Sequence, residues 1–61
     1  MAGYRLLLFD TAGQVHWQET FTAKTDADAL AEARAIFGVR REYSEYELSR
    51  GEQILERRQR G

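Results

Sequence analysis

"YRLLLFD", residues 4–10, is the stretch that decides the fold. Successive side chains of a β-strand point to opposite faces. Both faces are apolar here, with Leu6 and Leu8 on one and Leu7 and Phe9 on the other. A strand without a polar face is typical of the interior of a sheet that is covered on both sides. We therefore expect residues 4–10 to form a central strand.

A hairpin joins this strand to a second one. The turn "TAGQ", residues 11–14, contains a glycine that can take the positive φ of a tight hairpin. Residues 15–23 then alternate, so His16 and Trp17 point to opposite faces and cannot form one site. Glu19 is the one polar residue on the apolar face of this strand. We expect its carboxylate to pair with an arginine, within the chain or across a subunit boundary.

The sequence "TDADALAEARAIFG", residues 25–38, predicts an α-helix. Thr25 suits the N-cap, and Asp28 three residues later completes an approximate capping box. Apolar residues recur at helical spacing through Phe37, which indicates one face packed on the sheet. Gly38 is the expected stop.

Two further strands complete the chain. Residues 43–50 alternate between polar and apolar, and a turn at Gly51 leads to a short strand at residues 53–57. Residues 57–61, "RRQRG", are expected to form a frayed basic tail. The prediction is a single α+β domain, residues 1–61, with β-β-α-β-β order. Its four-stranded antiparallel sheet has the spatial order 2-1-3-4, with the helix packed on one face.

Composition excludes several classes of protein. The 61 residues contain no cysteine and one histidine, which excludes disulfides and thiolate or histidine-rich metal sites. The net charge of −1 argues against a dedicated polyanion binder. The apolar run at residues 6–9 is too short for a signal peptide, so we expect a cytoplasmic protein. We also expect no cofactor, no metal and no catalytic residue, because a two-layer domain of this size has little room for a cleft.

A homodimer is the expected assembly. A chain of about 60 residues buries only about 60% of its unfolded surface, and the helix can cover only one face of the sheet. The other face keeps part of the apolar set of residues 4–10, which a second subunit would cover, face to face or edge to edge. The candidate interface residues are Leu7, Phe9, Trp17, Glu19, Phe21 and Tyr46.

The expected function is that of a small non-enzymatic protein-interaction module, with two alternatives. The first is nucleic-acid binding, because basic loops beside aromatic residues can hold single strands. Its candidate contacts are Arg40, Arg41, Tyr43, Arg57, Arg58 and Arg60. The second is stacking of a small aromatic ligand on Trp17 in a groove between subunits.

His16 has no cysteine or second histidine to act with, and we expect it on the solvated face.

The segments "YRLLLFDTAGQV" and "YELSRGEQILER" flank an alanine-rich helix that opens on acidic residues. This pattern resembles a loose group of short, uncharacterised bacterial ββαββ proteins, from residue 4 to about residue 57. The resemblance implies the fold and carries no activity or site residue. Ser49 stands where such proteins often have an aromatic residue near the closing Glu-Leu pair, so the assembly of this chain is expected to differ if that aromatic contacts a partner.

Overall fold

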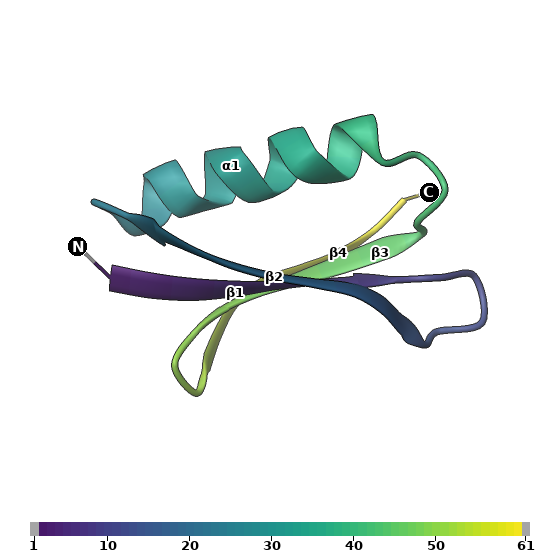
Figure 1. Ribbon diagram of the computed structural model, residues 1–61, viewed down its shortest axis with the longest axis horizontal. Helices are drawn as coiled ribbons and strands as arrows, with labels where there is room; N and C mark the ends of the chain where they lie inside the picture. Colours follow the sequence, from purple (N-terminus) through teal and green to yellow (C-terminus); the bar gives the residue numbers. More distant parts are fainter. Residues whose placement is uncertain (1, 61) are drawn as a thin grey trace.

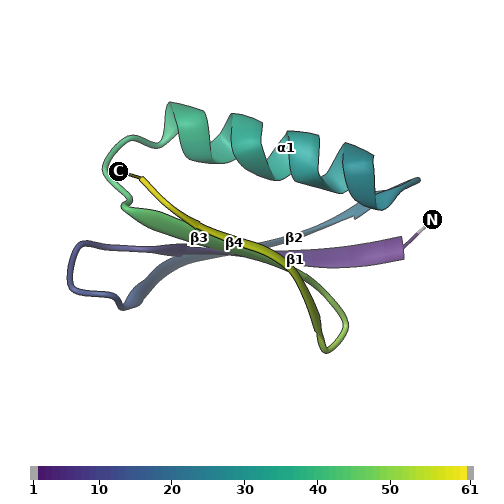
Figure 2. The same ribbon diagram turned by 180° about the vertical axis from the view of Figure 1, so that it is seen from behind.

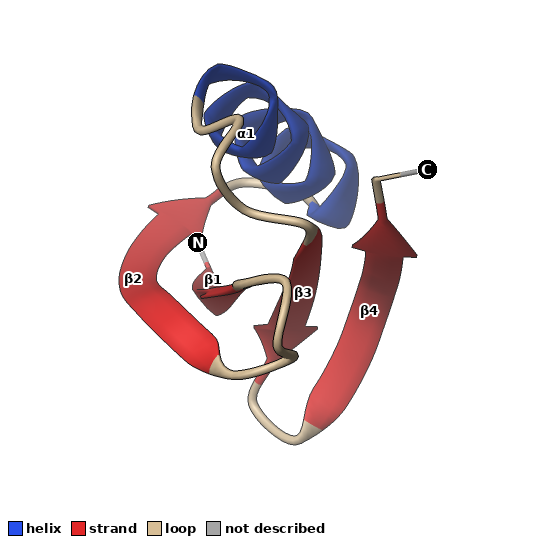
Figure 3. Cartoon of the chain, turned by 90° about the vertical axis from the view of Figure 1, so that its right-hand side faces the viewer, coloured by secondary structure: helices blue, strands red, loops and turns tan. Residues whose placement is uncertain are grey.

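The computed structural model describes residues 2–60 as four strands and one helix (Figure 1). In chain order they are β1 (Ala2–Phe9), β2 (Val15–Ala23), α1 (Asp26–Val39), β3 (Glu45–Arg50) and β4 (Gln53–Gln59). The strands form one antiparallel sheet in the order β2-β1-β3-β4, and α1 packs on one face of it (Figure 3). The predicted α+β class, element order and strand order are confirmed.

The two-sided apolar pattern of β1 matches its position between β2 and β3. Leu6 and Leu8 have no exposed surface and belong to the core cluster beneath α1. Leu7 is half-buried on the other face, where it aligns with Gln18 of β2 and Glu47 of β3. Leu7 is therefore part of the apolar set that the sequence places on the second face, and its direct neighbours on β2 and β3 are polar.

The carboxylate of Asp10 organises the β1–β2 hairpin. Its Oδ1 accepts hydrogen bonds from the backbone N–H groups of Ala12, at 2.9 Å, and Gln14, at 3.0 Å. Gly13 has a φ of 81°, which only glycine adopts without steric cost. The turn predicted at residues 11–14 is present and fixes the register of the two strands.

The start of α1 and its buried face follow the sequence. The side-chain oxygen of Thr25 accepts a hydrogen bond from the backbone N–H of Asp28 at 3.1 Å, so the predicted N-cap is confirmed. Ala29, Ala33 and Phe37 are buried against the sheet. Two alanines on this face allow the helix to approach the sheet closely, while the aromatic ring fills the wider end.

The predicted stop at Gly38 is wrong. The helix continues through Val39, and the backbone N–H of Arg40 donates to the carbonyl of Ile36 at 3.1 Å. A glycine stop requires a left-handed residue after the last turn, and Gly38 is not one of the positive-φ glycines. It serves as an ordinary helical residue.

The structure also differs from the sequence prediction at the end of β4 and at the starts of β1 and β3. The frayed tail expected at residues 57–61 is wrong where it is described, because β4 runs to Gln59 and the backbone N–H of Arg60 donates to Ser44 at 2.7 Å. Residue 61 lies outside the described residues. At the other end, β1 begins at Ala2, and β3 begins at Glu45 rather than at residue 43.

Seen from behind, α1 again lies on one side of the sheet, and the β3–β4 turn curves away on the other side (Figure 2). One face of the sheet is thus covered by the helix and the other faces outward. Within residues 2–60, no helix combines the length and the apolar character needed to cross a bilayer.

Candidate functional site

Three of the six residues expected at an interface lie on the two central strands of the sheet, β1 and β3. Tyr46 has no exposed surface, and its ring centroid lies 4.8 Å from that of Phe37 beneath α1. It is a core residue and offers a partner no surface. Phe9 is 8% exposed, with the Arg57 guanidinium 5.3 Å from its ring centroid. Leu7 is half-buried among polar side chains on the outward face.

The other three, Trp17, Glu19 and Phe21, lie in a row along the helix-facing side of β2, an edge strand. The ring of Phe21 stacks on Tyr4, with centroids 5.9 Å apart and 22° between the planes. The Arg40 guanidinium lies over Trp17, 4.1 Å from its ring centroid. Glu19 lies between the two aromatic residues and is half-buried. We call Trp17, Glu19, Phe21 and Arg40 the β2 flank.

Two polar groups of the β2 flank have no partner among residues 2–60. The indole Nε1 of Trp17 is buried and makes no hydrogen bond. The carboxylate of Glu19 makes no ion pair with any described residue, so the pairing with arginine predicted for it does not occur within this part of the chain. An unsatisfied buried donor costs about 1–3 kcal/mol. The half-buried carboxylate of Glu19 is therefore the polar group of the flank that a contact from outside could satisfy.

The opposite edge, β4, is tied to the fold by charged side chains. Arg34 of α1 donates to both carboxylate oxygens of Glu56, at 3.3 and 2.9 Å, and the Tyr46 phenol donates to the same carboxylate. The Arg34 bonds, followed by that from Tyr46, lower the pKa of Glu56, and burial raises the pKa of Tyr46. On the outward face, Arg57 pairs with Glu45 and lowers the pKa of that carboxyl. Two of the three charges of β4, those of Glu56 and Arg57, are thus paired within the chain.

The six residues considered for nucleic-acid contact do not form one basic surface. Arg57 is paired with Glu45, and Arg40 lies over Trp17. Tyr43 is 6% exposed, and its phenol oxygen lies 3.3 Å from Nδ1 of His16. The remaining three are Arg60, which is bound to backbone carbonyls, and the exposed Arg41 and Arg58.

Arg60 has a role that the sequence prediction missed. Its guanidinium donates to the carbonyl oxygens of Phe37, at 2.7 Å, and Tyr43, at 3.1 Å, and lies 4.1 Å from the Phe37 ring centroid. The last turn of α1 contains no basic residue of its own, so this arginine supplies the positive charge that favours a helix C-terminus. The one signal of this role in the sequence is that the last turn of the helix has no basic residue. That signal does not identify which distant arginine would supply the positive charge.

A second network joins the start of α1 to the sheet. The Tyr4 phenol donates to Asp26 at 2.7 Å, and the Arg50 guanidinium donates to the same oxygen at 2.7 Å. The hydrogen bond to Asp26 raises the pKa of Tyr4, with a smaller contribution from burial. Because all three groups bind one another, we regard this network as structural.

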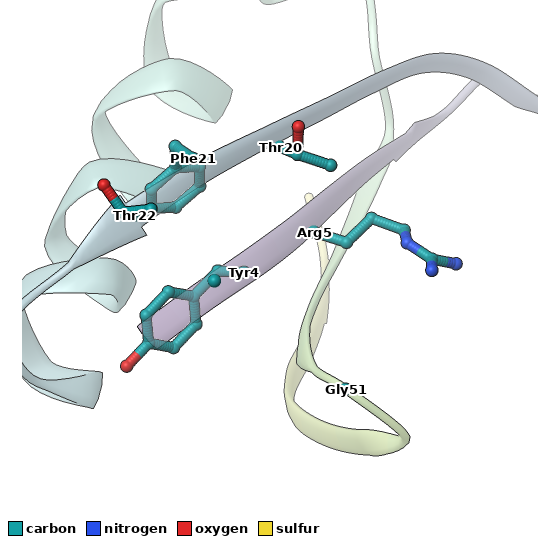
Figure 4. Close-up of a pocket in the computed structure, with 7 residues that line it drawn as sticks. Tyr4, Arg5, Thr20, Phe21, Thr22 and Gly51 are labelled. Atoms are coloured by element: carbon teal, nitrogen blue, oxygen red, sulfur yellow. The ribbon is translucent and has the colours of Figure 1, made fainter. Parts of the chain in front are cut away.

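A hollow of about 560 Å³ lies near the β3–β4 turn at Gly51. Figure 4 shows Tyr4 and Phe21 on neighbouring strands, with Arg5 directed away from both rings. Besides Tyr4 and Arg5, the polar side chains that line the hollow are Thr20 and Thr22. It lacks the paired titratable groups from which a catalytic site is recognised. Residues 2–60 also contain no group of three metal-ligating side chains close enough to share an ion.

No protein-family model, no curated protein and no solved structure matches this chain. The resemblance to short bacterial ββαββ proteins therefore stays a prediction.

Proposed function

We propose that this protein is a small non-enzymatic protein-interaction module that binds an extended segment of its partner along the outer edge of β2. The observation that carries the proposal is the lack of protection on that edge. The nine residues of β2 contain one carboxylate and no lysine, arginine or proline, and these are the residues that commonly keep other strands away from a sheet edge.

Strand addition supplies both affinity and selectivity. The outward N–H and C=O groups of β2 would bond the backbone of the incoming segment, and alternate side chains would lie over the β2 flank. Trp17 and Phe21 offer the segment aromatic surface, and Glu19 between them favours a cation. A segment with apolar residues on either side of a basic one fits this order.

The outward face of the sheet is a less suitable surface. Leu7 is flanked there by Gln18 and Glu47, and Arg5 and Thr20 are exposed. Stable interfaces between identical subunits have cores that are more apolar than this. Edge pairing is therefore favoured over the stacking of two sheets.

The two alternatives have weaker support. Arg57 and Arg60 already bind groups of the chain itself, and the net charge is −1, so phosphate attraction is small. Arg40 occupies a face of Trp17 on which a flat ligand would stack. Titration with single-stranded nucleic acid at increasing salt separates the first alternative, because phosphate-driven binding falls steeply with salt, whereas an apolar protein contact persists.

The test uses the wild-type protein to select peptides from a displayed random library. It then compares the binding of the selected peptides to two variants, one for each edge of the sheet. Gln18→Lys/Thr20→Lys places two lysines on exposed positions of β2, and Gln53→Lys/Gln59→Lys does the same on β4. We expect the β2 variant to lose the selected peptides and the β4 variant to keep them. Equal binding by the wild type and both variants, or the absence of selected peptides for a protein that is monomeric, would contradict the proposal.

A further inference from the structure

We infer that the strand added to β2 is β2 of a second copy of this chain, paired antiparallel about Gln18. In this arrangement Glu19 of each subunit forms an ion pair with Arg40 of the partner subunit. The inference rests on the proposed function, because it uses the same edge, and it names the occupant, the register and the charged contact.

The charges beside β2 are arranged so that two copies complement each other. Toward the end of β2, the groove between the strand and α1 is lined by Asp28 and Glu32, with Lys24 beside them. Toward its beginning, Arg40 lies over Trp17. An antiparallel pair of β2 strands brings the basic end of one copy to the acidic end of the other, with the unpaired Glu19 close to the boundary.

Two-fold symmetry limits the registers that are possible. An axis perpendicular to the sheet keeps both helices on one face and places a single residue of β2 opposite its own copy. In an antiparallel ladder, a residue and the one directly opposite it form either a hydrogen-bonded pair or a non-hydrogen-bonded pair. Backbone hydrogen bonding therefore allows any residue of β2 on the axis, and the side chains decide between these registers.

The side chains favour Gln18 on the axis. With Glu19 on the axis, two carboxylates would lie opposite each other, which is destabilising. With Thr20 on the axis, Glu19 would lie opposite Phe21 of the partner subunit, with no cation above it. With Gln18 on the axis, Glu19 lies opposite Trp17 of the partner subunit.

The last register supplies the contact that Glu19 lacks. Directly opposed Cβ atoms lie about 4.5–5.5 Å apart, and the Arg40 guanidinium lies 4.1 Å from the Trp17 ring centroid. The Arg40 side chain of the partner subunit is thus within reach of the Glu19 carboxylate. On the outward face the two Gln18 amides meet at the axis, where each can donate to and accept from the other.

The two helices leave room for this pairing. Strands are about 4.8 Å apart, so helices centred over the two β1 strands would lie about 14 Å apart. Directly packed helices lie about 8–10 Å apart. The joined sheet would have eight strands, with β4 at both outer edges and the two β2 flanks in the space between the helices.

A single introduced cysteine reports the register, because the chain has no cysteine of its own. Gln18→Cys would place the cysteine opposite its own copy, and we expect mild oxidation to give a covalent dimer. Thr20→Cys is the matched control on the same exposed face; its copies would lie more than about 13 Å apart, too far for a disulfide. Cross-linking of Thr20→Cys with no cross-linking of Gln18→Cys would overturn the register.

Charge exchange tests the ion pair. Glu19→Arg and Arg40→Glu each place like charges in both symmetry-related contacts, and we expect dimerisation to weaken at least about tenfold in either variant. The double variant Glu19→Arg/Arg40→Glu should restore it, while Glu52→Arg in the β3–β4 turn should leave the native mass unchanged. Circular dichroism confirms that each variant is folded. A double variant that is no better than the single ones would overturn the contact.

The native mass of the wild-type protein, measured by sedimentation at micromolar concentration, separates this inference from the proposed function. A dimer that is lost on exchange of either charge supports both. A monomer that still binds selected peptides through β2 overturns the inference and leaves the proposed function standing. A monomer that binds no peptide overturns both.

Discussion

The two edges of the sheet differ in where their charges find partners. Three of the seven residues of β4 are charged, and two of them, Glu56 and Arg57, are held by Arg34 and Glu45 within the chain. β2 has one charged residue in nine, Glu19, and its carboxylate has no partner among residues 2–60. Most of the charge of β4 is thus held by contacts of the chain with itself, whereas the single charge of β2 has no such contact among residues 2–60, which is why we propose β2 as the binding edge.

This difference predicts two kinds of mutational effect. Substitutions on β4 remove contacts between β4 and the rest of the chain, so they should lower the free energy of unfolding. If β2 binds a second chain as proposed, exposed substitutions on β2 should change association and leave the stability of the monomer within about 0.5 kcal/mol of the wild type.

The largest effect is expected for Glu56→Ala. It leaves the hydroxyl of the fully buried Tyr46 without its acceptor and frees the Arg34 guanidinium. We expect a loss of about 1–3 kcal/mol in the free energy of unfolding, the cost of an unsatisfied buried polar group. Urea unfolding followed by circular dichroism measures it.

Glu52→Ala is the matched control, because Glu52 is an exposed residue of the same charge in the β3–β4 turn. Its free energy of unfolding should be close to that of the wild type. A cost at Glu56 no larger than that at Glu52 would show that the charged contacts of β4 do not hold this edge.

A smaller effect is expected for Arg60→Ala. This variant loses the hydrogen bonds to the carbonyls of Phe37 and Tyr43 and the positive charge at the C-terminus of α1. We expect a cost of about 1 kcal/mol in the free energy of unfolding. Arg58→Ala, two residues earlier and exposed, is the control and should cost less. Equal costs would mean that Arg60 acts only through net charge.

Sequence reasoning recovered the fold because the decisive signals are local. The apolar run of β1, the alternation of β2 and the Thr25 cap each act within a few residues, and all three are present in the structure. The sequence also placed Trp17 and Glu19 on one face of β2 correctly, by the two-residue period of a strand. His16 lies at the irregularity of the β1–β2 pairing, beside Tyr43.

Apart from the helix stop at Gly38 and the strand ends, the errors concern contacts between residues far apart in the chain. Tyr46 was expected at an interface because alternation shows that it lies on an apolar face of its strand. Alternation does not show that α1 covers that face. Residues 57–61 were expected to fray because charge suggests solvation, whereas Arg57 and Arg60 find partners 12 and 23 residues away. A one-dimensional pattern gives the direction of a side chain and does not give the atom that it reaches.

Acid should affect the two edges unequally. The effect should be smaller than that of Glu56→Ala or Arg60→Ala, because a protonated carboxyl can still accept a hydrogen bond. The pKa values of Glu45 and Glu56 lie below their ordinary values, through Arg57 and Arg34 respectively. Their contribution to stability is complete above the unfolded pKa of about 4.3 and is lost as the pH falls through the folded values. Thermal unfolding of the monomer from about pH 7 to about pH 3 measures the loss.

The variant Glu45→Gln/Glu56→Gln should be less stable than the wild type at neutral pH and should show a flatter decline toward acid, because the two titrating groups have been removed. Glu19→Gln is the control from the opposite edge, and its monomer should follow the wild-type decline. If Glu19→Gln instead flattens the curve as much as the β4 variant does, its carboxylate is stabilising the monomer. The difference between a self-contained β4 edge and an open β2 edge would then be lost.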